Sequence, residues 1–232
     1  MKTTKTFKVP VLMTDRYENL TLRNLAALMF ELSYIQAEMA EAELDMSKLR
    51  WIVYSWDLQI DEPIAYGDEI EIGTDSLDMK KFYAYRNFYI RRAGKVIARA
   101  YVVFLLIDID RMRPVKVSEE LRLAYGSEDP YFIPEKFSYK KQFENTKTIQ
   151  VRNTDIDTNF HVNNTFYFDY IQDLLALDAR YVAYVNIVYK NEIRNKSQVL
   201  GEYITDGIEI DFRLRSTDDE TIYTYGKVIK NV

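Results

Sequence analysis

The chain has 232 residues, of which 47% are hydrophobic and 29% charged, and its formal net charge is −5. This is enough apolar material for one large domain or two of about 100 residues each. The absence of cysteine excludes disulfides, thiolate metal sites and a cysteine nucleophile, and a single histidine, His161, excludes zinc sites built on several imidazoles. The acidic balance argues against sequence-independent nucleic-acid binding.

No apolar run reaches the roughly 18 residues that a membrane span requires. The first 15 residues lack the apolar core of a secretory signal. We therefore expect a cytoplasmic protein with no membrane span.

In chain order, the first strong signal is an amphipathic helix over residues 21–43, where apolar residues recur on one face. Strand-like segments follow over 54–61 and 69–73, where apolar and polar residues alternate. The sequence then predicts an aromatic strand over 80–92, a hairpin turn at Ala93 and Gly94, and a returning strand over 95–108.

The second half repeats this order with a helix over residues 165–181 and strands over 184–193, 198–204, 208–214 and 221–229. We therefore predict an α+β duplication in which two long helices each pack on a curved antiparallel sheet and the sheets join edge to edge. Three of the five prolines, Pro114, Pro130 and Pro134, lie close to the join between the halves, so we expect domains at 1–125 and 143–232 with a linker at 126–142.

Chemistry-bearing residues are densest at 153–164, just before the second helix, where the only histidine, His161, follows Asp157 and Asn159. This segment places a hydrogen-bond donor, a proton carrier and carboxylates beside a helix N-terminus. Such a group suits a reaction that forms an oxyanion, because helix N–H groups favour developing negative charge. The alternative is purely structural: an asparagine caps the helix and Asp157 holds a turn.

The motif over residues 157–164 resembles the active-site segment of the acyl-acyl-carrier-protein thioesterases, which end fatty-acid synthesis in plants and many bacteria. It reads Asp157-x-Asn159-x-His161-Val162-Asn163-Asn164. In that family a catalytic glutamate follows about thirty residues later, and Glu192 stands in the matching place. Trp51, the stretch 63–72 and the hairpin at Gly94 also follow the family order, so the resemblance spans nearly the whole chain.

This resemblance implies a tandem double hotdog that hydrolyses fatty acyl-acyl carrier protein without a cofactor. The implied catalytic residues are Asp157, Asn159, His161 and Glu192. Glu192 would be the general base for water or a nucleophile that forms an anhydride, and the sequence leaves both open. Asn159 and His161 would orient the attacking group and polarise the carbonyl. Many plant members carry a cysteine after the glutamate, whereas this chain has Ile193, which excludes a Cys–His mechanism.

The resemblance also implies that the first half lines the acyl pocket. Candidate wall residues are its helix and the aromatic residues Phe82, Tyr83, Tyr85, Phe88 and Tyr89. Residues 80–107 contain no acidic residue, which suggests a surface for an acidic partner such as acyl carrier protein with its phosphopantetheine. The expected docking residues are Lys80, Lys81, Arg91, Arg92 and Lys95. An ordinary solvated hairpin is the alternative.

Three other functions stay open at this point: an acyl-CoA thioesterase, a hotdog-fold hydratase or dehydratase, and a non-catalytic acyl-binding module. A tandem chain supplies its own pseudo-dimer, so both a monomer and a homodimer fit the sequence.

Overall fold

The structure, a computed structural model, describes residues 1–140 and 142–231. Its first half contains β1 (Lys2–Lys8), α1 (Leu22–Ala40), β2 (Leu49–Ile60), β3 (Glu69–Lys80), β4 (Tyr83–Arg92), β5 (Lys95–Asp108), β6 (Arg113–Pro114) and α2 (Glu119–Tyr125). Its second half contains β7 (Asn145–Gln150), α3 (Phe166–Leu175), β8 (Val182–Tyr189), β9 (Gln198–Asp206), β10 (Glu209–Arg215) and β11 (Ile222–Lys230).

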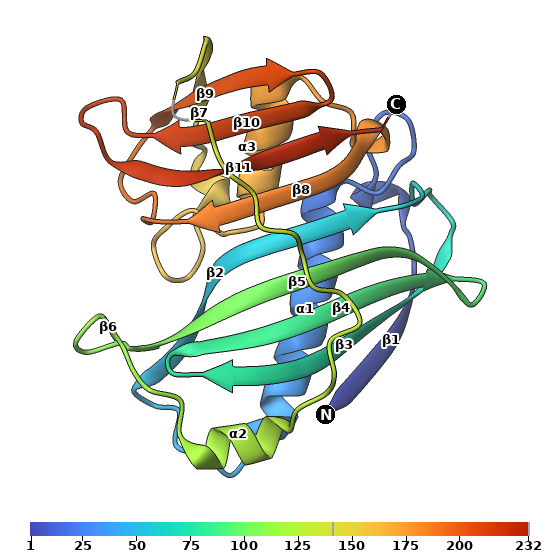
Figure 1. Ribbon diagram of the computed structural model, residues 1–232, viewed down its shortest axis with the longest axis vertical. Coiled ribbons are helices and arrows are strands. Elements are labelled where there is room, and N and C mark those ends of the chain that lie inside the picture. The colour runs from blue at the N-terminus through green and yellow to red at the C-terminus, as the bar shows by residue number, and fades with distance from the viewer. Residues whose placement is uncertain (141, 232) are drawn as a thin grey trace.

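The strands form one antiparallel sheet that curves around α1 and α3 (Figure 1). Their order is β1-β3-β4-β5-β2-β8-β11-β10-β9-β7, so the second half repeats the first in reverse across the β2–β8 boundary. There β2 and β8 pair antiparallel from Ser55 opposite Val188 to Gln59 opposite Tyr184. The predicted α+β duplication and its edge-to-edge join are confirmed.

The two helices differ in length. The first begins after Thr21, whose side chain accepts a hydrogen bond from the Asn24 N–H (3.2 Å). The second was predicted to reach residue 181 but ends at Leu175, because Ala176 adopts a left-handed conformation with φ 49°. The apolar spacing continues past this end because Leu177 packs on the core from a loop.

The predicted strand over 80–92 is also wrong at its start. Lys80 is the last residue of β3 and pairs with Tyr83, and the chain turns at Lys81, which has φ 56°. The predicted hairpin at Ala93 and Gly94 is confirmed: both have positive φ, as a two-residue type I′ turn requires.

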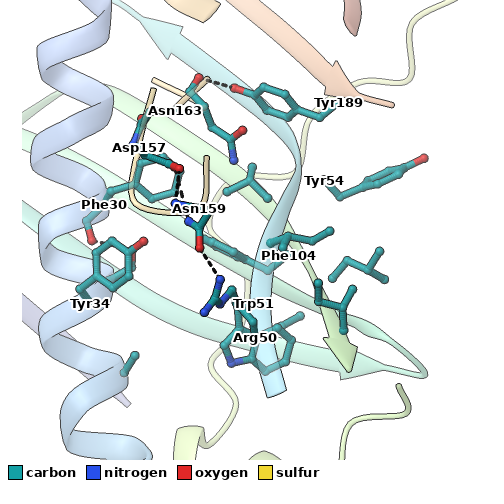
Figure 2. A pocket seen from close by; sticks show the side chains of 18 of the residues that line it. Phe30, Tyr34, Arg50, Trp51, Tyr54, Phe104, Asp157, Asn159, Asn163 and Tyr189 are labelled. Carbon is teal, nitrogen blue, oxygen red and sulfur yellow. Dashed lines mark hydrogen bonds between the residues drawn. The ribbon is translucent and has the colours of Figure 1, made fainter. Parts of the chain in front are cut away.

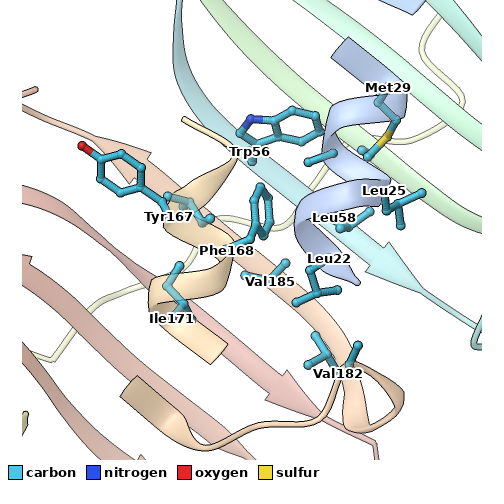
Figure 3. Packing of buried hydrophobic residues seen from close by; sticks show 14 of the residues in the cluster. Leu22, Leu25, Met29, Trp56, Leu58, Tyr167, Phe168, Ile171, Val182 and Val185 are labelled. Carbon is cyan, nitrogen blue, oxygen red and sulfur yellow. The ribbon is translucent and has the colours of Figure 1, made fainter. Parts of the chain in front are cut away.

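The core joins the two halves through Trp56 of β2, which is fully buried (Figure 3). Its indole lies 5.1 Å from the ring of Phe30 on α1, 6.1 Å from Phe88 on β4 and 5.9 Å from Phe168 on α3, measured between centroids. Both helices therefore pack against one aromatic cluster.

The connecting segment between α2 and β7 crosses the sheet face opposite α1 (Figure 1). In the first half, the Asn87 side chain donates to the Phe132 carbonyl (2.8 Å), and in the second, the Tyr139 hydroxyl donates to the Asn186 side chain (2.7 Å). These bonds hold the segment against both halves. Within the described residues, no helix is long and apolar enough to cross a membrane.

Replacing Phe168 by alanine is expected to lower the free energy of unfolding by about 3–5 kcal/mol, because it empties a buried site that both halves share. Urea denaturation measures the effect. The control is Leu123→Ala, whose side chain is 75% exposed on α2; it should change stability by less than about 0.5 kcal/mol. Similar small losses for both variants would contradict this account of the core.

Candidate active site

Asp157 organises the predicted polar loop. Its Oδ1 accepts a hydrogen bond from the Asn159 N–H (2.8 Å), and its own N–H donates to the His161 carbonyl (2.9 Å). Phe160 completes the turn with φ 60° and is 78% exposed. This tight turn brings Asn159 and His161 to the edge of one cleft.

Backbone bonding then brings the glutamate to the histidine. The Val162 N–H donates to the Ile193 carbonyl (3.0 Å), which docks the loop on the segment after β8. As a result, Glu192 Oε1 lies 3.6 Å from His161 Nε2. Glu192 was predicted inside a strand, but β8 ends at Tyr189, so the carboxylate lies in a loop and its side chain is 37% exposed.

The orientation of the imidazole follows from its second nitrogen. His161 Nδ1 lies 3.1 Å from the Val162 carbonyl oxygen and 3.8 Å from Asp157 Oδ2. A carbonyl oxygen only accepts, so Nδ1 carries the hydrogen and Nε2 faces Glu192. The structure thus brings all four predicted residues together around the cleft.

Two arginines that sequence reasoning missed hold this group. Arg194 donates from Nε and Nη2 to Glu192 Oε2, both at 2.6 Å, which leaves Oε1 facing His161. Arg50 of β2 donates from Nη1 to Asn159 Oδ1, which leaves the amide nitrogen of Asn159 facing Asp157 Oδ2 at 3.5 Å (Figure 2). The first half therefore contributes a side chain to the site.

The cleft has a volume of about 1090 Å³. It begins at the polar loop and extends through the space between α1 and β2 (Figure 2). This volume is slightly larger than the roughly 300–1,000 Å³ of typical small-molecule pockets. Aromatic side chains that line the cleft include Phe30, Tyr34, Tyr54 and Phe104. The helix is thus confirmed as a wall of the cleft.

Only Tyr85 among the five proposed wall aromatics lines this cleft in the described structure. Phe88 is fully buried in the core, and Tyr89 packs on Tyr131 of the connecting segment, on the other face of the sheet. Phe88 and Tyr89 differ from each other because neighbouring residues of β4 point to opposite faces of the sheet.

The five proposed docking residues do not form one patch. Lys80 and Lys81 lie at the β3–β4 turn, close to where the cleft-lining residues of β4 begin. The other three lie at the far end of β4, roughly 30 Å away at about 3.3 Å per residue. There Arg92 pairs with Glu62 (2.5 Å) and Asp68 (2.6 Å), Lys95 with Glu62, and Arg91 with Glu71 (3.2 Å).

The first half contains a matching loop with the same hydrogen bonds. Asp15 Oδ1 accepts from the Tyr17 N–H (2.8 Å), and the Asp15 N–H donates to the Asn19 carbonyl (2.8 Å). The Leu20 N–H donates to the Ile64 carbonyl (2.7 Å), as Val162 does to Ile193.

By this correspondence Asn159, His161 and Glu192 match Tyr17, Asn19 and Pro63. The duplication therefore preserves the loop backbone in both halves and the reactive side chains in one.

The structure thus combines a duplicated helix-on-sheet fold with one Asp–Asn–His–Glu group beside a cleft that has aromatic walls. The sequence matches the Acyl-ACP thioesterase N-terminal domain over residues 1–125 and the Acyl-ACP thioesterase C-terminal domain over residues 138–229. The chain belongs to the acyl-ACP thioesterase family.

Solved structures share the whole fold. An acyl-ACP thioesterase from Bacteroides thetaiotaomicron matches with a TM-score of 0.84 at 18% identity, covering 99% of this chain and 98% of that one. The 12:0-ACP thioesterase from Umbellularia californica matches with a TM-score of 0.83 at 15% identity, covering 99% and 97%. A protein described as an oleoyl thioesterase from Lactobacillus plantarum gives 0.81 at 23% identity, covering 100% and 97%.

One curated relative is a chloroplast palmitoyl-acyl carrier protein thioesterase from Arabidopsis thaliana. It is 27% identical over 143 residues, or 56% of this chain. The match spans 34% of that relative's length.

In a thioester-hydrolysis assay, Arg194→Met is expected to lower kcat by about 10- to 100-fold, because a hydrogen bond to a charged group contributes about 1.5–3 kcal/mol. KM should change little, and Arg194→Lys should restore part of kcat. Lys196→Met in the same loop, which removes an ion pair to Asp218 (2.6 Å), is the matched control. Equal kcat values for Arg194→Met and the control would show that Arg194 does not position Glu192.

Proposed function

We propose that this protein hydrolyses the thioester of fatty acyl-acyl carrier protein and releases free fatty acid, which ends fatty-acid synthesis. The observation that carries the proposal is the approach of Glu192 Oε1 to His161 Nε2, 3.6 Å apart, beside a cleft with aromatic walls. Membership of the acyl-ACP thioesterase family supports the same reaction.

In the general-base route, Glu192 takes a proton from water and the resulting hydroxide adds to the thioester carbonyl. The carbonyl oxygen becomes an oxyanion, to which the amide nitrogen of Asn159 donates. The intermediate then collapses, the C–S bond breaks, and the proton held by Glu192 goes to the departing thiolate. His161 orients the water beside Glu192.

In the nucleophilic route, the Glu192 carboxylate itself attacks the carbonyl and the thiolate departs, leaving a mixed anhydride that water hydrolyses. The clamp by Arg194 on Oε2 suits both routes, because Oε1 stays available to attack or to take a proton.

We assign residues 1–125 to the acyl pocket, 143–232 to the reactive loop and Glu192, and 126–142 to their connection. The support is the origin of the side chains: α1 and β2 line the cleft, and the second half supplies the Asp–Asn–His–Glu group. A cytoplasmic location and a monomeric or homodimeric state stay predictions.

We further propose that the carrier docks at the β3–β4 turn, where Lys80 and Lys81 lie near the cleft. Two features of Lys80 and Lys81 support this proposal: their positive charge suits an acidic carrier, and their position near the cleft suits a carrier that must bring its thioester to the reactive loop. Arg91, Arg92 and Lys95 belong to the original docking proposal, but they lie at the end of β4 far from the cleft. Ion pairing does not separate the two groups, because Lys80 pairs with Asp78 (3.1 Å) as these three pair with Glu62, Asp68 and Glu71.

An acyl-CoA thioesterase is the second candidate, since the same site would cleave either thioester. Carrier dependence of the rate separates the two substrates.

Glu192→Ala and His161→Ala are each expected to lower turnover by about a hundredfold or more, because a positioned acid or base contributes about 10²–10⁴ in rate. Thiol release from an acyl carrier protein substrate measures this. Glu220→Ala, an exposed carboxylate in the β10–β11 turn, should leave the rate unchanged. A near-wild-type rate for either site variant would remove that residue from the mechanism.

Reversing two charges, Lys80→Glu with Lys81→Glu, is expected to raise KM for carrier-bound substrate by about tenfold, because each exposed charge pair contributes up to about 1 kcal/mol. KM for a simple acyl-pantetheine should not change. The comparison is Arg91→Glu with Arg92→Glu, which should affect KM less. A larger effect of the second pair would move docking to the β4–β5 hairpin.

A further inference from the structure

The cleft changes character along its length. Near the reactive loop its walls include the rings of Phe30 and Tyr34 (Figure 2), whereas the ring of Phe104 lies farther along, 5.9 Å from the Arg86 guanidinium. At its other end, below the last turns of α1, a group of polar residues lies among apolar side chains such as Met79 and Ala84. The polar residues are Ser33, Glu41, Ser76, Arg86 and Tyr125.

Arg86 of β4 is the buried charge in this polar end, with 7% of its surface exposed. Its Nη1 donates to Gln36 Oε1 and to Thr74 Oγ1 (3.0 Å), and both acceptors are neutral. Gln36 is fully buried and is itself held by the Met1 carbonyl (3.0 Å) and Thr3 Oγ1 (3.1 Å). The guanidinium is therefore fixed in place by the fold.

No carboxylate in the described part of the chain forms an ion pair with Arg86. Glu41 lies at the same end, but its Oε1 accepts from Trp51 Nε1 (2.9 Å) and the Tyr125 hydroxyl (2.5 Å). Burial lowers the pKa of the Arg86 guanidinium to about 10, so the group stays charged at neutral pH.

A guanidinium has five N–H donors. Within residues 1–140 and 142–231, the hydrogen bonds found for Arg86 all leave from Nη1. The terminal methyl group of an acyl chain that contacts the guanidinium displaces water from these N–H donors and offers no acceptor in its place. The loss of those hydrogen bonds costs about 1–3 kcal/mol. An oxygen at the same point accepts from the guanidinium instead.

We propose that the end of the cleft at Arg86 is a subsite for an oxygen function, a hydroxyl or carbonyl, at the far end of the acyl chain. This inference rests on the proposed function for the identity of the chain. An acyl chain without such an oxygen, called a plain chain below, places its terminal methyl group against the charge when it reaches Arg86. Arg86 therefore also sets the greatest length of plain chain that the cleft binds well.

Binding of S-alkyl pantetheine thioethers tests the subsite apart from catalysis, because thioethers cannot be hydrolysed. Calorimetry compares plain chains of eight to eighteen carbons with chains that carry a terminal hydroxyl. At short lengths the hydroxyl lies against the ring of Phe30 and should weaken binding. At the length where plain chains stop binding well, it should strengthen binding by about 10- to 100-fold, as a hydrogen bond to a charged donor does.

In Arg86→Met this crossover, the change of the hydroxyl effect from weaker to stronger binding as the chain lengthens, should disappear. Longer plain chains should then bind. Arg91→Met, on the same strand but on its outer face, is the matched control and should keep the wild-type pattern. If Arg86→Met does not fold, the wild-type series still decides the matter.

A hydroxyl effect with the same sign at every length would overturn the subsite, whatever the rate of hydrolysis. A crossover in binding would support it even if no acyl-carrier thioester were cleaved, and the proposed function would then fail alone.

Discussion

The antiparallel pairing of β2 with β8 is the contact on which the site depends. It closes two half-sheets into one and removes the edge that each would otherwise expose. It also brings Arg50, at the start of β2, within hydrogen-bond reach of Asn159 in the other half. Because the cleft walls come from the first half and the reactive loop from the second, neither half alone contains a complete site.

The two halves share a backbone and differ in chemistry. Each has a loop that turns on an aspartate and docks on the segment after its central strand, through Leu20 and Ile64 in one and Val162 and Ile193 in the other. Only the second loop is followed by the glutamate that faces His161. The first half is thereby free to form the cleft, whose far end holds the buried charge of Arg86.

Periodicity predicted what local sequence controls: the start of α1, the turn at Ala93 and Gly94, and the repeated order of elements. It failed where one residue redirects the chain, as Ala176 ends α3 and Lys81 ends β3. The motif and the family resemblance together identified the four polar residues that meet at the cleft. Arg50 and Arg194 stayed hidden, because one acts across the halves and the other lies in an irregular loop where spacing predicts no contact.

The central claim is that this cleft and its Asp–Asn–His–Glu group cleave fatty acyl thioesters held on a carrier protein. The most direct measurement is thiol release from acyl carrier protein substrates of eight to eighteen carbons, with the matching acyl-CoAs alongside. The account predicts release that favours the carrier form and peaks within a limited range of chain lengths. No release from any of these substrates would contradict it.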